Sequence, residues 1–265
     1  MERTRGKRLR RPKGCALWTP VTSDLPVHEF FCSLAAPLFG VVQEGTVVPS
    51  WPPEAPLLTL YPRIIPFMYS AHFPIVLAST SPRRRELLGL TGLAFEIVPS
   101  PAEEPAPDAG EAPAFYAARM ARLKAAAVAA TRADAVVIGA DSIVAVGDLI
   151  LGKPADAADA QRMLGLLSGR THQVVTGCAL LAPGREPEIF TVTTDVTMTR
   201  LSEPAIAAYV ATGEPMDKAG AYAIQGQAAP FVSAICGSYT NVVGLPLAEL
   251  RSALEAMGAI DVSAT

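Results

Sequence analysis

The sequence predicts an α/β fold with a mixed central sheet flanked by helices. Short apolar runs suited to buried strands alternate along the chain with longer segments that favour helices. Two of the apolar runs end in polar groups, one in a Ser/Thr cluster and one in an acid, and open α/β sheets bind ligands at such strand ends. Half of the 265 residues are hydrophobic, which provides for a sizeable core.

The first 70 residues differ from the rest of the chain. They contain ten of the 24 prolines, and the stretch behind the basic run 1–13 has no clean period. They hold eight Lys/Arg and five Asp/Glu, a balance of +3, whereas the whole chain carries −3. We expect residues 1–70 to be a disordered extension or a gene-model artefact, with Met68 as a natural start, and residues 71–265 to form the folded domain.

The folded domain is expected to begin with a buried strand and a helix. The apolar run 75–78 is typical of a buried strand. Ser81 suits the N-cap of the next helix, and Pro82 suits its first turn. The elements expected after the strand are a helix over 83–90, a helix over 113–131, a buried strand over 135–140, a hairpin over 143–151, a helix over 156–167, paired strands over 173–181 and 188–199, and helices over 202–212 and 247–257.

The segment 79–85, Ser-Thr-Ser-Pro-Arg-Arg-Arg, lies at the first strand-to-helix junction and is a candidate phosphate site. Free backbone N–H groups and the positive end of the helix dipole favour an anion there. Guanidinium groups match phosphate oxygens in fork geometry. The plain alternative is an ordinary helix start with solvated arginines.

Two acidic positions are candidates for catalysis or metal binding. Asp141 comes directly after a buried apolar run, where a carboxylate can hold a divalent cation or accept a proton from water. Glu104 belongs to a Glu-Glu pair in a Pro-rich loop, and such acids can bind Mg²⁺ together with substrate phosphates. A turn residue and a solvated loop acid are the respective alternatives.

Two later segments offer a fixed cation and a base-reading amide. Lys153 precedes Pro154, which restricts the lysine's backbone. Gln225 carries both a donor and an acceptor, so it could read the edge of a nucleobase. Gly220 and Gly226 allow close backbone approach beside it. For each segment, an exposed polar loop is the alternative.

Taken together and in order, these segments resemble the Maf family. The resemblance runs from about Ile75 to the end of the chain, and the residues before 70 have no counterpart in it. The matching motifs are Ser79-x-Ser81-Pro82-Arg83-Arg84, Gly139-Ala140-Asp141-Ser142, Gly152-Lys153-Pro154, Ser168-Gly169-x-x-His172-x-Val174-x-Thr176-Gly177, Lys218-Ala219-Gly220-Ala221-Tyr222, Ile224-Gln225-Gly226 and Gly237-Ser238-Tyr239-x-Asn241-Val242-Val243-Gly244-Leu245-Pro246.

The resemblance implies a nucleoside triphosphate pyrophosphatase that leaves a monophosphate and pyrophosphate. It also implies a two-lobed fold with a cleft like that of the inosine triphosphatases, a divalent cation (Mg²⁺ or Mn²⁺), and assembly as a homodimer. Asp141 takes the role of proton acceptor, and Arg83, Ser142 and Gln225 fall at positions tied to substrate choice. Within this hypothesis Glu104 and Asp141 bind the metal, and the phosphates are bound by Ser79, Arg84, Lys124 and Lys153.

Substrate choice follows two motifs of the resemblance. Arg83 after Ser-Pro, and Ile-Gln-Gly at Gln225, are similar to the branch that acts on dTTP and UTP. The branch that prefers 7-methyl-GTP has Trp and Ser-Glu-Gly at these places. Ser142 departs from the family's usual Thr, for which we expect altered packing more than altered chemistry. The departure leaves base preference less fixed than the reaction.

Other functions remain open at this point. The enzyme implied by the resemblance could clear non-standard nucleotides or restrain cell division. A pyrophosphatase of different or broader nucleotide specificity would keep the same chemistry. A septation regulator would bind nucleotide with little turnover. An unrelated phosphate-binding α/β domain would leave the late segments around Lys218 and Gln225 unexplained.

Composition narrows the partners. A net charge of −3 gives no basic face for nucleic acid. No apolar run reaches the roughly 18 residues that span a bilayer, so no membrane partner is expected. The four cysteines include no CxxC pair, so a zinc site is not expected. We expect a cytoplasmic protein.

Overall fold

The computed structural model describes residues 68–263. All of them belong to one compact unit, Ile65–Thr265. The prediction for residues 1–70 falls almost wholly outside the described residues, so the proposed boundary at residue 70 stays a prediction.

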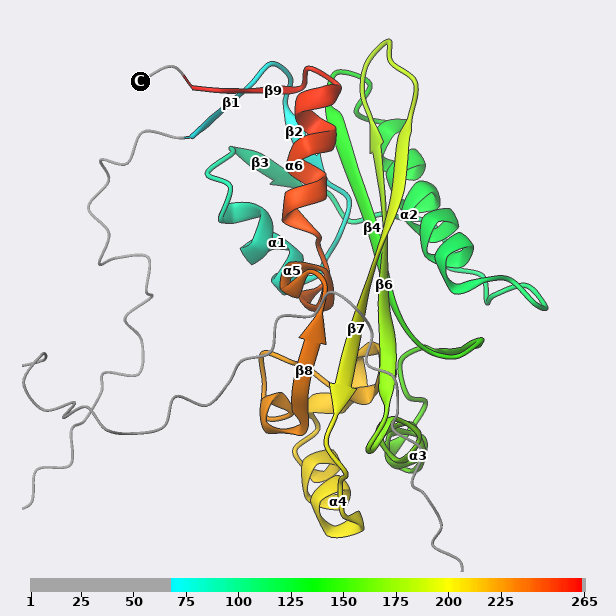
Figure 1. Ribbon diagram of the computed structural model, residues 1–265. Coiled ribbons are helices and arrows are strands. Elements are labelled where there is room, and N and C mark those ends of the chain that lie inside the picture. The colour runs from blue at the N-terminus through cyan, green and yellow to red at the C-terminus, as the bar shows by residue number, and fades with distance from the viewer. Residues whose placement is uncertain (1–67, 264–265) are drawn as a thin grey trace, which may run out of the picture. The chain divides into compact units, whose positions relative to one another are not determined.

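The central sheet is mixed, as predicted, with strand order β3-β2-β4-β6-β7-β8 and with β5 paired to β4 (Figure 1). β2 runs parallel to β3 and β4, and the remaining pairs are antiparallel. A separate antiparallel pair joins β1, Tyr69–Ala71, to β9, Ile260–Val262. The strands of the sheet are β2 Ile75–Leu77, β3 Phe95–Ile97, β4 Val136–Val146, β5 Leu149–Leu151, β6 Thr171–Leu181, β7 Glu188–Met198 and β8 Val232–Cys236.

Helices cover both faces of the sheet (Figure 1). Leucines of α1 and α6 pack on one face of β2 and β4, and alanines of α2 pack on the other. The predicted α/β class is therefore confirmed. The helices are α1 Pro82–Gly89, α2 Pro113–Ala129, α3 Ala157–Leu167, α4 Glu203–Ala211, α5 Tyr239–Val243 and α6 Leu247–Ala256, with short 3₁₀ segments at η2 Glu214–Asp217, η3 Ala219–Ala221 and η4 Ala229–Phe231.

One expected boundary is wrong. The strand predicted to end before Asp141 runs on as β4 to Val146, so Asp141 lies inside a strand rather than after one. The reason is that antiparallel β6 pairs with β4 from Val137 to Ala145 and extends it past the end of parallel β2 at Leu77. Asp141 therefore lies just beyond the carboxyl end of β2, on the neighbouring strand.

Two core clusters occupy the two ends of the sheet. The first packs α1 and α6 on the strands, and the second gathers α3, α4 and the 3₁₀ segments around the other ends of β4, β6 and β7. Ile224 packs against both clusters, which places the segment of Gln225 at their junction. Among the described residues, no helix is long and apolar enough to cross a membrane.

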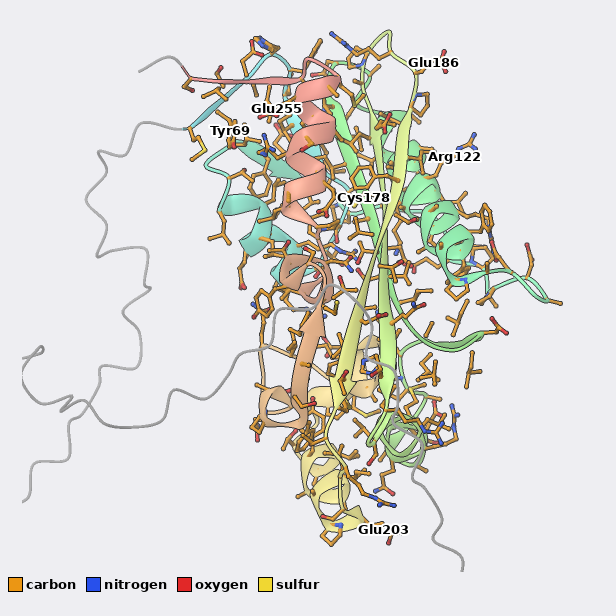
Figure 2. All side chains as sticks on the ribbon, viewed as in Figure 1. Tyr69, Arg122, Cys178, Glu186, Glu203 and Glu255 are labelled. Atoms are coloured by element: carbon orange, nitrogen blue, oxygen red, sulfur yellow. The ribbon has the colours of Figure 1, made fainter. Side chains whose placement is uncertain are left out.

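α2 approaches the sheet through two glycines. A Cβ on Gly139 of β4 would overlap the backbone oxygen of Ala121, and a Cβ on Gly177 of β6 would overlap the backbone of Ala117. The helix presents its alanines to these strands, while Arg122 points to the outer surface (Figure 2). The glycines and alanines together set the distance between helix and sheet.

Replacing Gly139 with alanine should lower the free energy of unfolding by about 1–3 kcal/mol, because the new methyl meets backbone that cannot move alone. Urea unfolding measures this change. Gly165→Ala is the matched control: Gly165 lies in α3 with open space around it, so this change should stabilise by about 0.5–1 kcal/mol. Equal effects of the two substitutions would contradict the close contact at α2.

The second cluster contains one buried polar pair. The His172 side chain of β6 is hydrogen-bonded through Nε2 to the Tyr222 hydroxyl at 2.8 Å, and the two rings meet edge-on. Both residues are buried. Burial lowers the pKa of His172 to about 4, opposed weakly by Asp195.

This buried histidine should make the protein sensitive to mild acid. Below its ordinary pKa of 6.5 the unfolded chain takes up a proton at His172, whereas the folded chain stays neutral until about pH 4. Stability is therefore lost as pH falls through this window, by roughly 3 kcal/mol in all. Urea unfolding from pH 7 to pH 4.5 should show a flatter profile for His172→Gln than for wild type. If the free energy of unfolding of the two proteins changed equally with pH, His172 would not be the source of the acid sensitivity.

Candidate functional site

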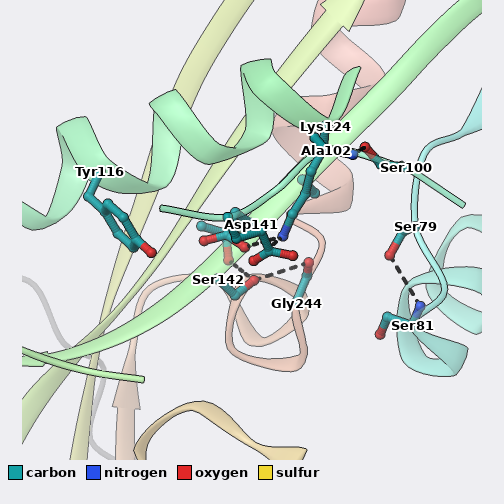
Figure 3. Close-up of polar contacts among 12 residues, drawn as sticks. Ser79, Ser81, Ser100, Ala102, Tyr116, Lys124, Asp141, Ser142 and Gly244 are labelled. Atoms are coloured by element: carbon teal, nitrogen blue, oxygen red, sulfur yellow. Dashed lines mark hydrogen bonds and ion pairs between the residues drawn. The ribbon is translucent and has the colours of Figure 1, made fainter. Parts of the chain in front are cut away.

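The Lys124 ammonium joins two carboxylates beside the sheet. Its Nζ lies 2.7 Å from Asp141 Oδ1 and 2.9 Å from Glu104 Oε2 (Figure 3). The side chains of Lys124 and Asp141 are each only 12% exposed, while that of Glu104 is 54% exposed. The Asp141 carboxylate is therefore largely shielded from solvent, whereas the Glu104 carboxylate bonded to the same ammonium is accessible.

The contact between α2 and the sheet produces this geometry. Asp141 shares the α2-facing side of β4 with Gly139, and its cross-strand neighbour is Gly177. Because neither glycine has a side chain, the helix lies low enough for Lys124 to reach the carboxylate. Larger residues at either glycine would lift the helix away.

Tyr116 fixes the loop that carries Glu104. The tyrosine stands on α2, and its hydroxyl donates to the carbonyl of Pro105 at 3.2 Å. Burial raises the pKa of Tyr116, and the charges of Asp141 and Glu104 raise it further. The phenol therefore keeps its proton and serves as a donor next to the two acids.

Arg84 binds the other side of β4 to neighbouring segments. Its guanidinium donates to the carbonyls of Gly244 and Ala140 at 2.9 Å each, to Ser142 Oγ at 3.1 Å and to Ser79 Oγ at 3.4 Å. Burial lowers the pKa of Arg84, and Asp141 opposes the shift. Four of the five N–H donors of Arg84 are thus used within the protein, which leaves one for a ligand.

The Ser142 hydroxyl begins a chain of buried polar contacts. It lies 2.9 Å from Thr176 Oγ1 on β6, which donates to the carbonyl of Asn241 at 3.2 Å. Asn241 Nδ2 donates to the carbonyl of Val174 and to Thr194 Oγ1. The chain ties β4, β6, β7 and α5 together behind the position that the sequence linked to substrate choice.

Two of the predicted cations carry no partner among residues 68–263. Neither the Arg83 guanidinium nor the exposed Lys153 ammonium forms a hydrogen bond or ion pair there. The hydrogen bond from Lys218 lowers the pKa of Asp217, and the charge of Arg83 adds to this shift, so Arg83 lies within electrostatic range of Asp217. Both cations are free to meet an anionic ligand.

The turn of Gln225 is anchored through its backbone, while its amide is free. The Gln225 side chain is exposed and forms no hydrogen bond with other described residues. Gly226 N donates to the carbonyl of Ala223 at 3.0 Å, which closes the turn. The loop of Lys153 meets the preceding segment, since Gly220 N donates to the carbonyl of Gly152 at 3.0 Å.

Residues 74–257 match the family model described as "Maf-like protein". The chain belongs to the Maf family. Among relatives of this Maf chain is a dTTP/UTP pyrophosphatase of Geobacter metallireducens, 54% identical over 188 residues that cover 70% of this chain and 97% of the relative. Another is a dTTP/UTP pyrophosphatase of Nitratidesulfovibrio vulgaris, 52% identical over 192 residues that cover 72% of this chain and 91% of the relative.

Solved structures similar to this Maf chain include two Ham1 proteins. The Staphylococcus aureus Ham1 protein is 17% identical with a TM-score of 0.43, and a HAM1 protein from Coxiella burnetii is 20% identical with a TM-score of 0.41. Each comparison covers 69% of the Maf chain and 99% of the other chain.

The structure brings most of the predicted site residues of the Maf chain together in two linked groups. Asp141, Lys124 and Glu104 meet on the α2 side of β4, and Ser79, Arg84 and Ser142 meet on the other side. Arg83, Lys153 and Gln225 form no hydrogen bond or ion pair with either group in the described part of the chain.

Sequence reasoning missed the residues that support the site. Tyr116 and Thr194 were not selected because hydroxyl side chains of helices and strands are common. Thr176 and Asn241 stood in matching motifs, but nothing in their spacing indicated that both are fully buried, with Asn241 of α5 bonded to β6 and β7. A buried amide must find hydrogen-bond partners, so its burial was the missing signal.

The acids of the Maf site fit a divalent cation held jointly with a substrate. Among residues 68–263, no group of three or more His, Cys, Asp and Glu could hold a metal alone. Asp141 and Glu104 supply two carboxylates around one ammonium. Mg²⁺ is usually bound by one or two carboxylates together with substrate phosphates and water, which this arrangement matches.

Proposed function

We propose that this Maf protein hydrolyses dTTP and UTP to the nucleoside monophosphate and pyrophosphate. The relatives described above, at 52% and 54% identity, carry the name dTTP/UTP pyrophosphatase. The observation that carries the proposal is the protected Asp141 carboxylate, which is paired with Lys124 on one side of β4 while Ser79, Arg84 and Ser142 meet on the other side. An acid so placed suits a reaction that attacks a polyphosphate.

In the proposed reaction, Asp141 orients a water molecule and accepts its proton as the water attacks the α-phosphorus. The bond from the α-phosphorus to the bridging oxygen breaks, and pyrophosphate leaves with that oxygen. The Asp141 carboxylate is restricted to one direction by Lys124, so the base is positioned before substrate arrives. Release of the monophosphate and loss of the proton to solvent restore the carboxylate.

Basic and hydroxyl groups offset the charge of the triphosphate. Arg83 and Lys153 are free to do so, and Lys124 can turn from Asp141 toward a phosphate oxygen. Arg84 contributes its charge and its remaining N–H. Ser79 Oγ accepts from Ser81 N and from Arg84, so its own proton is available to a phosphate oxygen. Such preorganised donors supply much of the catalysis in phosphate chemistry.

Asp141 and Glu104 would hold Mg²⁺ or Mn²⁺ when the substrate is bound. The cation would neutralise charge on the phosphates and polarise the phosphoryl group under attack. Base choice is proposed to depend on Gln225 at the edge of the base, with Arg83 and Ser142 as further determinants. Homodimer assembly, cytoplasmic location, the absence of nucleic-acid and membrane partners, and a role in clearing nucleotides or restraining cell division stay predictions.

Asp141→Asn should reduce kcat by a factor on the order of 10²–10⁴, since an amide cannot accept the proton. Pyrophosphate release from dTTP measures it, with circular dichroism to confirm folding. Asp195→Asn serves as control, because Asp195 is an exposed acid whose one side-chain hydrogen bond within residues 68–263 comes from Gln173. Near wild-type turnover of Asp141→Asn would remove Asp141 from the role of base.

Wild-type protein with Mg²⁺ or Mn²⁺ should release pyrophosphate from dTTP and UTP faster than from CTP, GTP or ATP.

Gln225→Ala should reduce this preference for dTTP and UTP by about tenfold, as expected for losing a base-reading pair of hydrogen bonds. Gln227→Ala is the matched control, since the fold uses its backbone N–H and not its side chain. Release from other nucleotides would overturn the specificity. Tight nucleotide binding without pyrophosphate release would favour a septation regulator.

A further inference from the structure

The Glu214 carboxylate accepts several hydrogen bonds next to the turn that carries Gln225. Its Oε1 accepts from the Tyr209 hydroxyl at 2.8 Å, and both of its oxygens lie 3.0 Å from the backbone N of Gln227. A Cβ on Gly226 would overlap this carboxylate. The glycine therefore lets the turn close directly on the acid.

Tyr209 extends the same anchor to the other end of the turn. Its hydroxyl accepts from Ala223 N at 3.2 Å while it donates to Glu214. Edge-on packing against Phe231, with ring centroids 5.4 Å apart, fixes the ring. Burial and the hydrogen bond to Glu214 raise the pKa of Tyr209, so the phenol keeps the proton that it donates.

These two side chains hold both ends of a five-residue segment, 223–227. The backbone at Ala223 is bound by Tyr209 and the backbone at Gln227 by Glu214. Between them, the Gln225 side chain is exposed and forms no hydrogen bond to other residues of the described region. A fixed backbone with a free amide is the arrangement expected of a preorganised recognition group.

We propose that Glu214 and Tyr209 are positioning residues for nucleobase selection. Together they hold the segment 223–227 so that the Gln225 amide meets the base of the bound nucleotide. Neither side chain needs to touch the substrate. The inference rests on the proposed function, because it requires a nucleotide whose base Gln225 reads.

The test compares kcat and KM for dTTP and CTP among wild type, Glu214→Ala, Glu214→Gln and Tyr209→Phe. Glu214→Ala should lower the dTTP-over-CTP ratio of kcat/KM by about tenfold, mainly through a higher KM for dTTP, because it removes the bond at Gln227 and the acceptor that fixes the Tyr209 hydroxyl at Ala223. Tyr209→Phe should lower the ratio by about threefold. Glu214→Gln should keep it, since its amide oxygen accepts from both Tyr209 and Gln227.

The control is Glu255→Ala, which removes a carboxylate paired with Arg251 on α6, and it should leave the ratio unchanged. An equal loss of kcat/KM on both nucleotides in Glu214→Ala would overturn the proposal, as would a Glu214→Gln protein that behaves like the alanine variant. If Glu214→Ala does not fold, a wild-type ratio in Tyr209→Phe overturns it. Wild-type protein that hydrolyses neither nucleotide rejects the proposed function itself, and the inference with it.

Discussion

The arrangement of the site depends on the close contact between α2 and the sheet. At Gly139 and Gly177 the helix lies against strand backbone without intervening side chains. This contact brings Lys124 within 2.7 Å of Asp141. The Lys124 ammonium is shared with Glu104, and Tyr116 holds the loop of Glu104 through the carbonyl of Pro105. Packing therefore determines the electrostatics of the acid.

Arg84 makes the second connection between packing and chemistry. Arg84 belongs to α1, and it donates to β4 and to Gly244 between α5 and α6. One side chain therefore joins three segments that are distant in sequence. Because most of its donors are used internally, it is held more rigidly than Arg83, which has no partner among the described residues. Adjacent arginines in one motif therefore have different physical roles, one fixed and one free.

Much of the fold was predictable because local patterns determine it. The long helices and central strands came from apolar periodicity and from turn residues such as Ser81-Pro82 and Gly169. The short elements β1, β3, β8, β9 and α5 were missed, since segments of three to five residues carry too little periodicity. The equally short β2 and β5 were predicted from an unbroken apolar run and from a Gly-Asp turn. Asp141 was selected as an acid that follows a buried strand, whereas its place inside β4 depends on pairing with β6, which is distant in sequence. The contacts of Tyr209 with Ala223 and of Glu214 with Gln227 join residues 14 and 13 positions apart, so they too depend on how the chain folds back.

The separate anchoring of the turn 223–227 has an evolutionary consequence. The groups that hold this turn come from α4, η2 and the turn itself, whereas Asp141, Lys124 and Arg84 are held by α2, β4 and the segment before α6. The two sets share no hydrogen bond among the described residues. On the proposed function, substitutions within this turn can change which base is recognised without disturbing Asp141, Lys124 and Arg84. Natural selection can therefore derive from one domain several enzymes that share a reaction and differ in their nucleotide.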